Sequence, residues 1–281
     1  QKAHFLFGPG EDFKADYSNL VPSVALGWSF APARSLSATY DMRISRPGIY
    51  YLNPYLNAGN PLEVTVGNPY LKPERHNSVA LAYTGMHGAF MISSRLSYTF
   101  FNDGLTGLMY VRDGVRYTTY ANAMHGKNVT LALNATWRIG MKSTLMCGIT
   151  PSYINKRADN FANHGWMLNV FAGLQQKLPW NLNLGANVFA MTPQVELQGR
   201  GVSQFVHMLT LGRSFLKEDR LNVTVSVINP FYSRMNIKQI EYGDGYMSRT
   251  TGHMNLRMVQ VSVSLRLGKL NSRVEGRDKI D

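Results

Sequence analysis

The chain has 281 residues and a formal net charge of +12, yet only 16% of its residues are charged, against roughly 25% in typical soluble domains. Its single cysteine, Cys147, excludes an internal disulfide framework. No apolar run approaches the roughly eighteen residues of a transmembrane helix, which excludes a helical membrane protein. The basic residues are scattered over predicted turns and loops without a nucleic-acid motif, so we expect no nucleic-acid partner.

Alternation of apolar and polar residues predicts β-strands along the chain. In segment 128–138, Val129, Leu131 and Leu133 point to one face, and the intervening residues are Thr130, Ala132 and Asn134. Successive side chains of a strand point to opposite faces, so each such segment has one apolar face and one polar face. The same pattern, or an equivalent apolar run, is found in chain order at 21–30, 35–45, 181–190, 221–228 and 258–267.

The connections between these strands alternate strictly between short and long. Short turns are predicted at 31–34, 86–88, 138–141, 177–180 and 215–219. Long loops are predicted at 46–76, 101–126, 156–163, 193–201 and 229–254. In an antiparallel sheet all short turns then lie at one end and all long loops at the other. Bacterial outer-membrane barrels have this asymmetry, with short periplasmic turns and longer extracellular loops.

A soluble β-sandwich would also alternate, but its outer face would carry many Lys and Glu side chains. Here the polar face consists mostly of Ser, Thr, Asn and Gly. Predicted strands of about ten residues match the height of a hydrocarbon core, and Trp28, Trp137 and Trp180 lie beside short turns, as in an interfacial aromatic girdle. The predicted fold class is therefore all-β, an antiparallel transmembrane β-barrel.

The number of crossings bears on the domain organisation. We count about eleven, whereas single-chain bacterial barrels have even numbers, and barrels of about 22 strands hold a plug in the lumen. We therefore expect the C-terminal half of a larger barrel, with strands and extracellular loops in residues 1–270 and a charged tail in 271–281. An additional strand near residues 3–14 would instead make a self-contained barrel of about twelve. Gln1 opens the chain without a leader, so either a signal peptide was removed or the sequence belongs to a longer chain.

A proline-rich motif occupies the first long loop. Each Asn-Pro step fixes a turn, and each proline restricts the residue before it, so the loop is expected to be rigid without a core. The motif residues are Arg46, Pro47, Asn53, Pro54, Gly67, Asn68, Pro69, Lys72, Pro73 and Glu74.

This motif resembles the C-terminal barrel of TonB-dependent receptors, and especially the outer-membrane β-barrel family common in Bacteroidetes. Segments 16–23 and 261–269 are also similar to that family, although Leu267 stands where the family usually has an aromatic residue. The resemblance implies a receptor in the Gram-negative outer membrane that imports a scarce solute: an iron chelate, cobalamin, an oligosaccharide or a peptide. It implies energy coupling to TonB through an N-terminal region that this sequence lacks, and it admits a surface lipoprotein as a further partner.

Two other hypotheses about the function stay open. The first is a plugless barrel with a passive porin, adhesive or structural role. The second is a barrel enzyme that uses His207 and Ser203. The sequence shows no third residue at a spacing that would orient the histidine and no identifiable oxyanion donor, so we expect no enzymatic activity. The histidines lack paired ligand spacing, and we expect neither a metal site nor a cofactor. Anionic lipopolysaccharide and outer-membrane lipid are expected partners of the surface Lys and Arg residues.

Tyrosines concentrate in the predicted extracellular loops. Aromatic faces with hydroxyl groups suit the capture of sugars, peptides or aromatic chelates, although ordinary loop packing would also account for them. The cluster at 241–246 has too few carboxylates for a calcium loop. The candidate ligand-binding residues are Tyr50, Tyr51, Tyr55, Tyr117, Tyr120, Tyr242, Asp244 and Tyr246.

Overall fold

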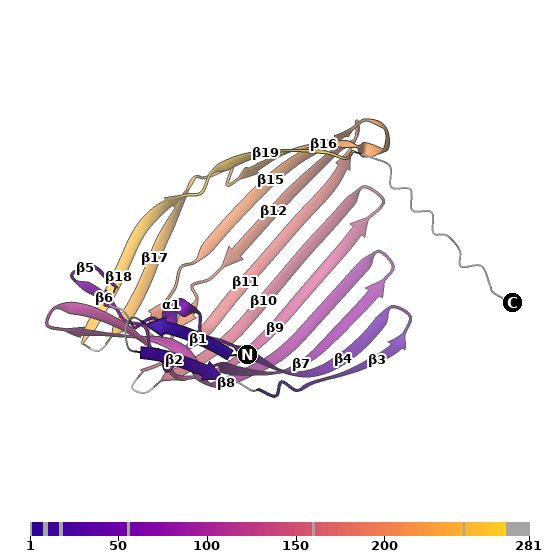
Figure 1. Ribbon diagram of the computed structural model, residues 1–281. Helices are drawn as coiled ribbons and strands as arrows, with labels where there is room; N and C mark the ends of the chain where they lie inside the picture. The colour runs from indigo at the N-terminus through magenta and orange to yellow at the C-terminus, as the bar shows by residue number, and fades with distance from the viewer. Residues whose placement is uncertain are drawn as a thin grey trace.

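The computed structural model describes residues 2–7, 11–16, 19–54, 57–158, 161–243 and 245–267. Eleven strands follow one another as antiparallel neighbours in a single curved sheet (Figure 1). In chain order they are β3 (Ser23–Ala31), β4 (Arg34–Ser45), β7 (Glu74–His87), β8 (Phe90–Arg112), β9 (Val115–Ile139), β10 (Ser143–Ala158), β11 (Phe161–Leu178), β12 (Leu182–Met191), β15 (Gln204–Phe215), β16 (Leu221–Ile228) and β19 (Met258–Leu265). The eleven predicted crossings are confirmed, and the sheet is a partial barrel whose end strands β3 and β19 do not pair with each other.

The apolar face of this sheet is exposed. Leu26, Trp28 and Leu81 are 68%, 65% and 48% exposed, and β19 carries Val259, Val261 and Val263 on the same face. The opposite face presents Ser, Thr, Asn and Gly, for example Thr210 against Ser226. A broad exposed apolar face is incompatible with water as its solvent, whereas lipid favours it. No helix among the described residues is long and apolar enough to cross a membrane.

The short turns lie where the sequence places them. Gly88 and Gly140 adopt φ values of +58° and +63° in two of them, a conformation that glycine accepts without steric cost. Trp28, Trp137 and Trp180 are 65%, 47% and 78% exposed close to these turns. Their predicted position beside the short turns is confirmed.

Much of the predicted loop sequence is instead strand, which corrects the expected boundaries. The expected loop 101–126 belongs to a long hairpin, because β8 and β9 contain 23 and 25 residues and continue beyond the rim (Figure 1). A β-bulge near Gly104, next to Asp103 at φ +58°, absorbs the Asn-Asp-Gly sequence that reads as a loop. The expected loop 156–163 is also largely strand, since β10 ends at Ala158 and β11 begins at Phe161.

The remaining long connections form a separate small sheet. The expected loop 229–254 is mostly the hairpin of β17 (Arg234–Gly243) and β18 (Tyr246–Asn255). The expected loop 193–201 contains β13 (Val195–Glu196) and β14 (Gly199–Arg200), and the four strands pair in the order β13-β14-β17-β18. Glycines and polar residues interrupt the apolar alternation in these segments, so the sequence alone predicts loops there.

The N-terminal region does not supply a twelfth strand of the main sheet. Strand β1 (Lys2–Phe7) pairs with β2 (Glu11–Asp16) in a two-stranded sheet of their own. The expectation of an additional barrel strand near residues 3–14 is therefore wrong for this structure. The charged tail predicted at 271–281 lies outside the described residues.

Candidate functional site

The proline-rich motif is folded against the long β8–β9 hairpin. The segment holds α1 (Ile49–Leu52), β5 (Asn57–Asn60) and β6 (Glu63–Thr65), and β6 pairs in parallel with β9. Two of its backbone bonds are Gly67 N–H to Asn53 O at 2.9 Å and Asn68 N–H to Tyr51 O at 2.7 Å. A Cβ on Gly67 would lie 2.2 Å from that same Asn53 oxygen, so only glycine fits this close approach.

Asparagine side chains fasten the second half of the motif. Asn68 Nδ2 donates to Tyr120 O at 2.9 Å, while the backbone N–H of Tyr70 donates to Asn68 Oδ1 at 3.0 Å. Asn122 on β9 accepts from Lys72 N–H at 2.6 Å and donates to Lys72 O at 2.9 Å. Leu71 between them is 1% exposed.

The motif ends at Glu74, whose carboxylate contacts β8 and the neighbouring His76. Glu74 accepts a hydrogen bond from the backbone N–H of Leu105, and its other oxygen lies 3.0 Å from His76 Nε2. Pro47, Pro54, Pro69 and Pro73 are partly buried and Arg46 is exposed. The motif that carries the family resemblance therefore builds and anchors a loop.

Three of the predicted tyrosines come together beside this loop. The ring centroids of Tyr51 and Tyr120 are 4.8 Å apart, and Tyr50 lies 5.5 Å from Tyr51 and 6.2 Å from Tyr120, all in edge-to-face geometry. Tyr50 and Tyr51 are 58% and 36% exposed. Burial, followed by the hydrogen bond with Tyr50, raises the pKa of Tyr120 to about 12. The cluster thus presents hydroxyl groups and ring faces beyond the rim.

The other candidate tyrosines lie apart from this cluster. Tyr117 stacks on Tyr110 across the β8–β9 hairpin, with centroids 5.4 Å apart and planes at 11°. Tyr242 and Tyr246 lie at the tip of the β17–β18 hairpin, where Tyr242 is 45% exposed. The Tyr246 hydroxyl is buried without a hydrogen-bond partner in the described chain, and burial raises its pKa. Tyr55 and Asp244 lie outside the described residues.

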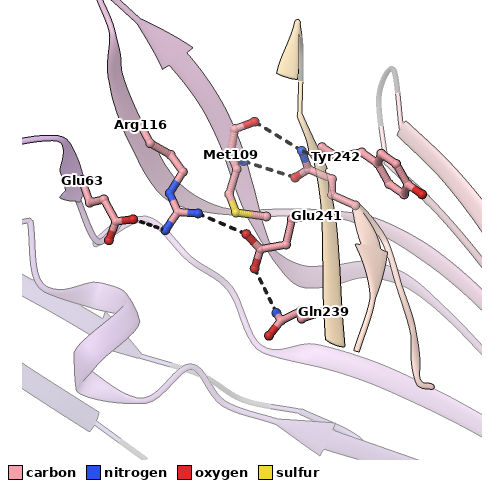
Figure 2. Close-up of polar contacts among 7 residues, drawn as sticks. Glu63, Met109, Arg116, Gln239, Glu241 and Tyr242 are labelled. Carbon is pink, nitrogen blue, oxygen red and sulfur yellow. Dashed lines mark hydrogen bonds and ion pairs between the residues drawn. The ribbon is translucent and has the colours of Figure 1, made fainter. Parts of the chain in front are cut away.

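An ion-pair network that the sequence did not predict joins three segments beyond the rim (Figure 2). The guanidinium of Arg116 on β9 lies 2.7 Å from Glu63 Oε1 and 3.1 Å from Glu241 Oε2 on β17. Gln239 donates to the second oxygen of Glu241 at 2.9 Å. No spacing rule could reveal this network, because 125 positions separate Arg116 from Glu241.

Gln198, in the β13–β14 turn, makes a second connection between the β8–β9 and β17–β18 hairpins. Its side chain, 4% exposed, exchanges hydrogen bonds with the backbone of Met109 on β8 at 3.2 Å in both directions. It also donates to Tyr242 O at 3.0 Å, and its own backbone O accepts from Tyr242 N–H at 2.7 Å. The β8–β9 hairpin, the β13–β14 turn and the β17–β18 hairpin are therefore fastened together by buried or partly buried polar contacts.

His207, the centre of the enzyme alternative, has a packing role. It is 6% exposed, its Nε2 accepts a hydrogen bond from Phe231 N–H at 3.1 Å, and its ring stacks on Phe231 with centroids 5.1 Å apart. Ser203 makes no hydrogen bond to it. Within the part of the chain that the structure describes, no group of three His, Cys, Asp or Glu side chains could hold a metal ion.

Solved structures share this fold at low sequence identity. The FrpB iron transporter from Neisseria meningitidis is 18% identical with a TM-score of 0.60, and the match covers 91% of this chain and 40% of that one. The siderophore receptor PirA from Pseudomonas aeruginosa is 15% identical with a TM-score of 0.61, covering 87% and 43%. The copper transporter OprC is 14% identical with a TM-score of 0.63, covering 86% and 39%. The chain thus spans about two fifths of the length of these proteins.

No curated protein matches the sequence. The model of the outer membrane protein beta-barrel family, in contrast, matches residues 6–265, which is nearly the whole chain. The sheet with its exposed apolar face and the loop motif described above agree with that match. The chain therefore belongs to the outer membrane protein beta-barrel family and is a protein of the Gram-negative outer membrane.

Proposed function

We propose that this chain is part of the barrel of an outer-membrane receptor that imports a scarce solute with energy supplied through TonB. The observation that carries the proposal is the set of fastened extracellular segments, with an aromatic cluster, above a sheet whose inner face is polar. A receptor needs a preorganised outer surface because each loop that must order on binding lowers the affinity. A passive pore has no such requirement.

The Tyr50, Tyr51 and Tyr120 rings are the proposed contact surface for the solute. Rings with hydroxyl groups bind ligands that combine flat or apolar surface with hydrogen-bonding groups. An iron or copper chelate has this chemistry, and FrpB, PirA and OprC are named for iron, siderophore and copper transport. Cobalamin, an oligosaccharide or a peptide would use the same groups. A surface lipoprotein covering the loops is compatible with this role.

The test is uptake by cells that carry the full-length gene as their sole copy. Labelled ferric and copper chelates, cobalamin, an oligosaccharide and a peptide are supplied at limiting concentration, with and without TonB. We expect one solute class to enter only when both the receptor and TonB are present. We further expect Tyr51→Ala with Tyr120→Ala to reduce uptake, and Tyr110→Ala, on the far part of the same hairpin, to leave it unchanged.

Uptake that is independent of TonB and that falls as the solute becomes larger would contradict the proposal. That result would favour the alternative, a plugless barrel with a passive, adhesive or structural role. Normal TonB-dependent uptake by the double tyrosine variant would support the receptor function but contradict the assignment of the aromatic cluster to its binding surface.

A further inference from the structure

The apolar band on the outer face of the sheet ends abruptly near the extracellular rim. Register places Val79, Tyr98, Val129, Tyr153 and Trp166 in one row across strands β7 to β11. The next outward-facing row toward the rim is Asn77, Phe100, Lys127, Asn155 and His164, and the row after it contains Arg75, Asn102, His125, Arg157 and Ala162. Within two residues along each strand, the outer face changes from apolar to polar and basic.

A groove of about 530 Å³ lies at this border. Tyr98, Phe100, Phe101 and Gly126 form its apolar part, and its polar lining consists of Asn102, His125, Lys127, Asn155 and Arg157. We call these five polar residues the basic shelf. No carboxylate lines the groove, while Asp103 lines the neighbouring groove with Arg75.

The two permanent cations of the basic shelf are available to a ligand. Lys127 and Arg157 are exposed, and neither forms an ion pair with a carboxylate among the described residues. Register pairs Lys127 with Asn155 and His125 with Arg157, so the two cations are diagonal neighbours. Diagonal neighbours in an antiparallel pair lie roughly 7–8 Å apart, a separation that one phosphate group can bridge. His125 is held at 3.1 Å from Asn102 Oδ1 at the same level.

We propose that the basic shelf binds the phosphate groups of lipopolysaccharide from the outer leaflet. Its Lys and Arg side chains would donate charge-assisted hydrogen bonds to a phosphate on the sugar headgroup. The acyl chains of the same molecule would then lie against the apolar row from Val79 to Trp166 directly below. The proposal depends on the outer-membrane location of the chain and not on import of any solute.

A lipid-borne phosphate fits the groove better than a free phosphate ion for two reasons. The cations lie on the lipid-facing side of the sheet, away from the polar inner face. Tyr98 and Phe100 form a continuous apolar surface between the cations and the membrane band, which an isolated ion would leave uncovered. A phosphorylated amphiphile covers both parts at once.

The experiment uses the full-length protein extracted from outer membranes with a mild detergent. Purified lipopolysaccharide, phosphatidylglycerol and inorganic phosphate are each titrated, with binding followed by native mass spectrometry and by thermal stabilisation. The test variant combines Lys127→Gln and Arg157→Gln. The matched control combines Arg95→Gln and Arg138→Gln, which remove two exposed cations from the opposite face.

We expect the wild type to retain lipopolysaccharide, the test variant to bind it at least about tenfold more weakly, and the control to match the wild type. The variant Lys127→Arg with Arg157→Lys keeps both charges and should restore binding, which separates loss of the site from poor folding. Equal binding by the test and control variants would overturn the proposal. Protection by inorganic phosphate alone, or by phosphatidylglycerol as effectively as by lipopolysaccharide, would overturn the assignment of the ligand.

Discussion

Replacement of Gly67 by alanine should loosen the loop that carries the family motif. The new Cβ would lie 2.2 Å from Asn53 O and 2.8 Å from the Asn53 backbone C and N, so backbone atoms must move. Overpacking of this kind costs about 1–3 kcal/mol. The movement also weakens the bonds Gly67 N–H to Asn53 O and Asn68 N–H to Tyr51 O, each worth about 0.5–1.5 kcal/mol. We therefore expect local opening to become easier by about 3 kcal/mol, roughly a hundredfold.

Amide hydrogen exchange of the full-length protein measures this directly, because local opening is reported by peptides that cover residues 65–72. Gly48→Ala is the control in the same loop, since its Cβ would contact only Tyr51 Cδ2 at 3.9 Å and Gly48 has φ −70°. Equal protection of residues 65–72 in both variants would refute the view that the close approach of Gly67 to Asn53 holds the motif loop in place.

Three further outcomes test the contacts beyond the rim. Arg116→Gln removes both ion pairs of a side chain that is 30% exposed, so exchange in β17 and β18 should rise by a factor that corresponds to about 1 kcal/mol; Arg112→Gln, which removes a pair at 78% exposure, should not change it. Leu71→Ala should destabilise the loop by about 2–5 kcal/mol, because Leu71 is 1% exposed, whereas Leu62→Ala, at 63% exposure, should have little effect in the same assay. The folded state holds the Tyr120 proton more tightly than the unfolded chain, so the contribution of Tyr120 to stability is present below pH 10.0 and is lost as the pH rises to about 12. Tyr120→Phe should abolish the step in tyrosinate absorbance near that pH. Persistence of the step in this variant would refute its assignment to Tyr120.

The barrel strands could be predicted because lipid imposes a strict rule on every crossing. Alternation in segments such as 35–45 and 221–228 reports which face meets lipid, and β4 and β16 cover those segments. The same rule ends at the rim. Beyond the rim, the extensions of β8 and β9 and the strands β17 and β18 contact other loop segments. Their sequences therefore do not follow the alternation that lipid imposes, and the sequence predicts loops there.

The site was only partly predictable for a related reason. Tyr50, Tyr51 and Tyr120 were found as aromatic residues in predicted loops, but their meeting depends on the Asn68 and Asn122 contacts that dock one loop on another. The link from Arg116 to Glu63 and Glu241 depends on three segments that are distant in sequence. Such contacts follow from tertiary arrangement, which composition and spacing do not encode.

The orientation of the sheet underlies both the receptor and the lipopolysaccharide proposals, and one labelling experiment tests it. In a Cys147→Ser background, Tyr70→Cys in the motif loop and Met141→Cys in a short turn introduce thiols at positions that are 78% and 94% exposed. Intact cells are treated with a membrane-impermeant maleimide. We predict labelling at position 70 in intact cells and at position 141 only after the outer membrane is permeabilised. Labelling at position 141 but not at position 70 in intact cells would contradict the account.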